Sequence, residues 1–129
     1  MSHDSVYRIP TADLLDTSLN DEQLAKKIEF VGQKPMSDGI ELLADNTVII
    51  TDVENGGLAA LYPDGRLEAL TKDGAVDWAD SVTIAPDGSI WFTDSRLTDL
   101  IDQFARPASQ AVMADNAPYA IYKVDGITN

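Results

Sequence analysis

Two aspartates in matching local contexts are the residues of this 129-residue chain best suited to chemistry. Asp38 lies two residues after Met36, and Asp80 lies two residues after Trp78. Carboxylates brought together suit a hard divalent cation such as Ca²⁺, which takes oxygen ligands. Such a cation could polarise a carbonyl group and activate water. The structural alternative is that each carboxylate accepts backbone N–H groups in the loop leading into its strand.

Both aspartates belong to an internal repeat. Residues 37–52 align without a gap with residues 79–94, at an offset of 42. The identical pairs are Asp38 with Asp80, Asp45 with Asp87, Thr51 with Thr93 and Asp52 with Asp94. Each copy consists of two runs rich in β-branched or aromatic residues around a turn signal, which predicts strand, tight turn, strand. Further turn signals at 54–57 and 63–65 extend the first copy to four short antiparallel strands.

This repeat predicts an all-β fold. A period of about 40 to 45 residues with four strands per unit is typical of β-propeller blades; a β-sandwich built from hairpins is the alternative. We expect one partial domain over 1–129: a third-strand remnant and helical connection at 6–36, a blade at 37–72, and a blade at 79–124 interrupted by an insertion at 95–118. Helical insertions are expected between Ser18 and Gly32 and at 96–104.

The number of blades predicts an assembly. The chain supplies about two four-stranded blades and parts of others, whereas a propeller closes with about four to eight. We therefore expect it to pair with the remaining blades of a longer protein, of which it is a fragment, or with copies of itself. Strand edges and apolar faces left open would otherwise favour aggregation.

The composition excludes several classes of function. Nine Lys and Arg against 22 Asp and Glu give a formal charge of −13, which opposes binding to nucleic acid or to an anionic membrane. The chain has no cysteine, and its one histidine, His3, lies near the N-terminus, so cysteine chemistry is excluded and a Ser-His pair is disfavoured. The polar stretch 1–5 predicts no signal peptide in this chain.

Four segments, 7–15, 34–40, 77–82 and 86–95, resemble the C-terminal blades of the major royal jelly protein/Yellow family, in particular its bacterial members. The resemblance covers nearly the whole chain but only the last third to half of the usual family domain. It implies a six-bladed propeller that binds a small molecule in its central channel, and it suggests secretion of the full-length protein.

The chain is more distantly similar to the gluconolactonase and senescence marker protein (regucalcin) group, which is also six-bladed. That group holds a divalent cation with an Asn from an Asn-Gly-Leu motif, an Asp from a Pro-Asp-Gly motif and a Glu from the first blade. Asp38-Gly39-Ile40 falls on the first motif with Asp replacing Asn. Asp80-Ser81-Val82 falls on the second with Ser replacing Gly. The blade that carries the Glu has no counterpart in this chain.

Two functions follow as expectations. The first is ligand binding without turnover, with Asp38, Asp80, Met36 and Trp78 around the ligand. The alternative is a metal-dependent, gluconolactonase-like hydrolase of lactones, with Ca²⁺ or another divalent cation on Asp38 and Asp80. Packing between blades is an equal alternative for Met36 and Trp78, and Trp91 is expected in the core. The residues leave open whether the protein is an enzyme.

Overall fold

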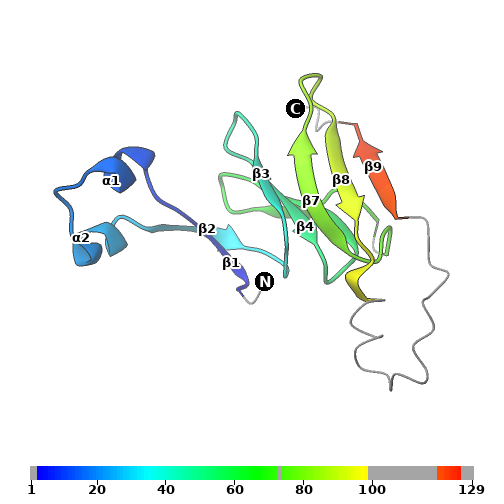
Figure 1. The fold of residues 1–129 in the computed structure, drawn as a ribbon, viewed down its shortest axis with the longest axis horizontal. Coiled ribbons are helices and arrows are strands. Elements are labelled where there is room, and N and C mark those ends of the chain that lie inside the picture. Colours follow the sequence, from blue (N-terminus) through cyan, green and yellow to red (C-terminus); the bar gives the residue numbers. More distant parts are fainter. Residues whose placement is uncertain (1–2, 73, 99–118, 126–129) are drawn as a thin grey trace, which may run out of the picture.

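The computed structural model describes residues 3–72, 74–98 and 119–125 as three antiparallel sheets and two short helices (Figure 1). The first sheet pairs β1 (Ser5–Arg8) with β2 (Glu29–Gln33), and α1 (Thr11–Leu15) and α2 (Asp21–Ala25) lie between them in sequence. The second has the order β3 (Ile40–Leu42), β4 (Val48–Asp52), β5 (Gly57–Leu61), β6 (Leu67–Ala69). The third has the order β7 (Ala79–Ile84), β8 (Ile90–Asp94), β9 (Ala120–Val124). The predicted all-β class is confirmed.

Three tight turns of the same construction connect β3 to β4, β5 to β6 and β7 to β8. Each has one residue with positive φ, namely Asn46 at 68°, Gly65 at 85° and Gly88 at 81°. The aspartate before it accepts the backbone N–H two residues further on, at 2.9–3.0 Å, in Asp45, Asp64 and Asp87. These aspartates are therefore explained by local turn structure, because Asp and Asn side chains stabilise such turns.

The repeat is preserved in individual backbone hydrogen bonds at the offset of 42. Leu43 N–H donates to Thr47 O at 2.9 Å, and Ala85 N–H donates to Ser89 O at 2.8 Å. The matching bonds after the second strand of each copy are Val53 N–H to Met36 O and Ser95 N–H to Trp78 O, both 3.1 Å. The two copies therefore have the same hairpin structure as well as the same residue pattern.

The second sheet is the middle layer of a stack (Figure 1). All residues of β4 and β5 are buried. On one face Ile49, Leu58 and Ala60 pack with Ile90 and Phe92 of β8. On the other face Val48, Ile50 and Leu61 pack with Val6 of β1. Because successive side chains of a strand point to opposite faces, β4 contributes to both cores.

The helix expected between Ser18 and Gly32 is much shorter in the structure. Only α2 (Asp21–Ala25) is helical, with an Asn20–Gln23 capping box, and Glu29–Gln33 forms β2 instead. The pairing of Val6 with Gly32 and the burial of Gly32 against Leu61 favour the strand over the helical spacing. The expected insertion at 95–118 and the helical segment at 96–104 lie mostly outside the described residues.

The prediction that Trp91 lies in the core is wrong. Trp91 is 39% exposed, whereas its neighbours Ile90 and Phe92 are buried against the middle sheet. It therefore lies on the outer face of the third sheet, where Lys123 is its cross-strand partner.

No helix among the described residues is long and apolar enough to cross a membrane.

Candidate functional site

The two repeated aspartates lie where β3 and β7, the first strands of the two copies, run next to each other. β3 and β7 are in contact; Asp38 comes two residues before β3, and Asp80 is the second residue of β7. The two copies approach closely at Gly39, where an added Cβ would lie 2.5 Å from the carbonyl oxygen of Asp80. Glycine is needed here because only a residue without a side chain permits this contact.

A hydrogen bond joins the two copies at this place. The indole Nε1–H of Trp78 donates to Oδ2 of Asp38 at 2.5 Å. Trp78 is 8% exposed, and its backbone N–H donates to Oδ1 of Asp94 at 3.1 Å. Trp78 is therefore held both at its indole ring and at its backbone. The bond from the ring to the exposed carboxylate of Asp38 is charge-assisted.

The hydroxyl of Thr51 holds the loop that leads into β3. The carboxylate of Asp94 holds the loop that leads into β7 by accepting the N–H groups of Asp77 and Trp78. The buried Oγ1 of Thr51 accepts the N–H groups of Asp38 at 3.1 Å and Gly39 at 2.9 Å, and it donates to Gly39 O at 3.2 Å. Thr93 Oγ1 accepts the N–H of Ser81 at 3.1 Å. The carboxylate of Asp38 itself accepts a side-chain donor, because its Oδ2 accepts the indole N–H of Trp78.

The other two predicted site residues differ in their surroundings. Asp80 is half-buried, and its Oδ1 accepts the hydroxyl of Ser81 at 3.4 Å. Met36 is 36% exposed, and its backbone N–H donates to Oε2 of Glu54 at 2.7 Å. Asp38, Trp78 and the backbone of Asp80 therefore meet at one place, and Met36 lies on the chain that leads into it.

Sequence reasoning missed Thr51 and Thr93, Glu54 and Lys34. The threonines carried a signal, because they occupy the same position in both copies. Glu54 adds a carboxylate next to Met36. Lys34, half-buried, donates from Nζ to Oγ of Ser37 at 2.8 Å, which brings a cation beside the loop of Asp38. Neither of these two has a same-type partner 42 residues later.

Asp38 and Asp80 alone carry fewer carboxylate oxygens than the ligands that a calcium ion takes. Ca²⁺ is bound by about six to eight oxygens, whereas the described part of the chain contains no group of three or more His, Cys, Asp or Glu side chains that could hold a metal. Oδ2 of Asp38 is already an acceptor for Trp78. A cation on Asp38 and Asp80 would need further ligands from elsewhere.

Comparison with known proteins adds no relative. No protein-family model matches this chain, and no curated protein matches it significantly.

Proposed function

We propose that this chain forms successive blades of a β-propeller and binds a small organic ligand where the first strands of neighbouring blades meet. The observation that carries the proposal is the Trp78–Asp38 hydrogen bond, which links equivalent loops of two successive repeats. In this interpretation β3 and β7 are innermost strands, and the ends that carry Asp38 and Asp80 face a central channel.

The arrangement of the sheets supports the propeller. The middle sheet is a simple meander from β3 to β6, and the next sheet lies face to face with it and repeats its first three strands. Equivalent strands, β3 and β7, lie next to each other. Repeating such a step around an axis generates a propeller, which closes with about four to eight units. β1 and β2 then correspond to the third and fourth strands of a preceding blade.

The side chains around the Trp78–Asp38 contact suggest the chemistry of the ligand. Asp38 and Asp80 supply carboxylate acceptors, and Met36, which is 36% exposed, supplies apolar surface beside the buried Trp78. A small organic cation with an apolar or aromatic part satisfies both, since carboxylates pair with its charge and the thioether side chain of Met36 packs well against apolar and aromatic groups. The net charge of −13 also attracts cations and repels anions.

A metal-dependent hydrolase of lactones is the second candidate. The carboxylates of Asp38, just before β3, and Asp80, at the start of the adjoining strand β7, favour it. In such an enzyme the two aspartates would supply part of the ligand set of Ca²⁺ or another divalent cation. The cation would polarise the lactone carbonyl.

Titration with benzylammonium, a probe that has one cation and one ring, tests the first proposal. The chain has two tryptophans, so a Trp91→Phe background makes the emission report on Trp78 alone. We expect benzylammonium to change this emission, and we expect Asp38→Asn to weaken the effect at least about tenfold, a loss of about 1.4 kcal/mol. Asp64→Asn is the matched control, because it removes the same charge from a turn aspartate. An equal response in Asp38→Asn and Asp64→Asn would refute the site.

Isothermal titration with Ca²⁺ separates the two candidates. Binding heat that disappears in both Asp38→Asn and Asp80→Asn, but stays in Asp64→Asn, supports the metal-dependent hydrolase. Absence of heat in the wild-type chain removes that candidate and leaves the organic ligand to the fluorescence test.

A further inference from the structure

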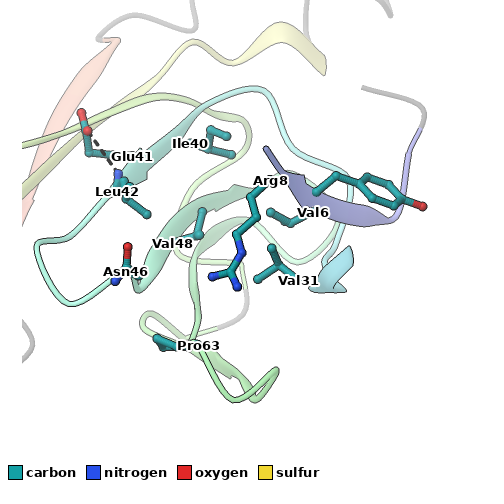
Figure 2. Close-up of a pocket in the computed structure, with 10 residues that line it drawn as sticks. Val6, Arg8, Val31, Ile40, Glu41, Leu42, Asn46, Val48 and Pro63 are labelled. Carbon is teal, nitrogen blue, oxygen red and sulfur yellow. Dashed lines mark hydrogen bonds between the residues drawn. The ribbon is translucent and has the colours of Figure 1, made fainter. Parts of the chain in front are cut away.

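A hollow lies between β1 and β3, on the face of the middle sheet opposite to β7. Its volume is about 360 Å³. Figure 2 shows Ile40 and Leu42 of β3 on one side and Val6 and Val31 of the first sheet on the other. Val48 of β4 lies between them. The hollow is therefore an apolar groove, and we name it the β1–β3 groove.

The repeat provides an internal comparison for this groove. At the offset of 42, Val82 and Ile84 of β7 correspond to Ile40 and Leu42 of β3. Val82 and Ile84 are partly buried and pack on the core that the middle sheet shares with the third. Ile40 and Leu42 are 59% and 58% exposed. The same positions are thus covered in one copy and uncovered in the other.

The difference arises from the strands that lie over each position. β3 and β4, a complete hairpin, both contact β7. Over β3 the described part of the first sheet offers β1 and β2 alone, and these pack instead on Val48, Ile50 and Leu61. Two strands placed beside β1 would lie over β3 as β3 and β4 lie over β7.

One edge of β1 can receive such a strand. In the proposed propeller β1 is a third strand, as β5 and β9 are in their own sheets. β5 and β9 pair antiparallel with β4 and β8, the second strands of those sheets. Among the described residues β1 has no such partner and pairs with β2 alone. An unpaired edge is a template for strand addition, and a sheet of two strands is only marginally stable. Tyr7, 59% exposed, is on this strand and lines the groove.

We propose that the β1–β3 groove is the docking site of a two-stranded β-hairpin of the same type as residues 37–54. Its second strand adds antiparallel to the free edge of β1, and its apolar face covers Ile40 and Leu42. A second copy of this chain cannot supply the hairpin from its own β3–β4, because Ile49 and Ile50 are fully buried there. The inference rests on the repeat that also underlies the proposed propeller, and it does not depend on ligand binding at Asp38.

A synthetic peptide with the sequence of residues 37–54 tests the proposal. It is titrated into the ¹⁵N-labelled chain while amide hydrogen exchange is measured. We expect exchange in β1 to slow about tenfold or more at saturation, because backbone N–H groups at its free edge gain partners. A peptide that carries Lys in place of Ile49 should leave the exchange unchanged, since its docking face is no longer apolar.

A variant with both Ile40→Lys and Leu42→Lys should lose the effect of the peptide. Both side chains are more than half exposed, so these changes leave the core intact. Ile121→Lys, on the outer face of the third sheet and 70% exposed, should respond like the wild type.

Two results would overturn the inference: no slowing in β1 at saturating peptide, or equal slowing in the double variant. Protection of β1 that depends on the concentration of the chain alone would also overturn it, in favour of pairing between copies. A chain that binds the peptide but not benzylammonium would refute only the proposed ligand, and the reverse result would refute only the hairpin.

Discussion

Replacement of Thr51 by Val is the substitution that most directly tests how the loop before β3 is held. Thr51 is fully buried, and its hydroxyl accepts two backbone N–H groups and donates to one carbonyl. Val keeps the shape of the side chain and removes all three hydrogen bonds. Thr93, its counterpart, accepts one N–H group, from the exposed residue Ser81.

The expected magnitude follows from the exposure of these groups. A buried N–H left without an acceptor costs about 1–3 kcal/mol. Asp38 is exposed and its N–H regains water, whereas Gly39 is half-buried, so we expect Thr51→Val to lower the free energy of unfolding by about 2 kcal/mol. For a chain of this length that corresponds to roughly 6–10 °C in Tm. Thr93→Val should cost about 0.5–1 kcal/mol, because its single donor is reached by solvent.

Urea unfolding of the full chain, followed by tryptophan fluorescence, measures both effects. Thr51→Ser is the control that restores the hydroxyl, and it should recover most of the loss. The reasoning is refuted if Thr51→Val and Thr93→Val are equally destabilising, or if Thr51→Ser loses as much stability as Thr51→Val.

Three further substitutions test other contacts. Gly39→Ala should destabilise by about 1–3 kcal/mol in thermal melts, because its Cβ would meet the backbone of Asp80 at 2.5 Å; an unchanged Tm would contradict this contact. The hydroxyl of Ser89, followed by its backbone N–H, lowers the pKa of Asp87 from 3.8, so Ser89→Ala should raise that pKa in an NMR titration. The stabilisation that Ser89→Ala removes is present above pH 3.8 and disappears as the pH falls through the lowered pKa of Asp87, and an unmoved pKa would exclude this cause. Leu58→Ala should cost about 2–5 kcal/mol in urea unfolding, since Leu58 is 1% exposed in the core shared with β8; a cost below about 1 kcal/mol would show that this core is not closely packed.

The hairpins of the fold were predictable because their signals are local. A turn position with positive φ favours Asn or Gly, as at Asn46 and Gly88. The β-branched residues on either side of such a turn then indicate the two strands of a hairpin. The strand β2 was not predictable in this way. Its residues also fit one face of a helix, and only pairing with β1, more than 20 residues earlier in the chain, decides between the two.

The candidate site was predictable in position but not in detail. The repeat identified Asp38 and Asp80, since matching positions of stacked units lie near each other. It could not indicate that Trp78 would donate to Asp38 across the two copies, because that contact depends on how closely the sheets approach at Gly39. It also placed Trp91 in the core, because alternation along a strand does not tell which face is covered.

The burial of β4 and β5 on both faces has a consequence for how the chain folds. Residues 48–50 and 58–61 are all apolar, and the two strands that contain them pair locally, so this hairpin can form early with little loss of chain entropy. Its two faces are covered by partners that lie far apart in the sequence, Val6 on one side and Phe92 on the other. During synthesis the hairpin therefore exposes an apolar face until β8 has been made. Over that interval two acidic residues between the apolar runs, Asp52 at the end of β4 and Glu54 in the loop, act as the charged interruption that opposes association between unfinished chains.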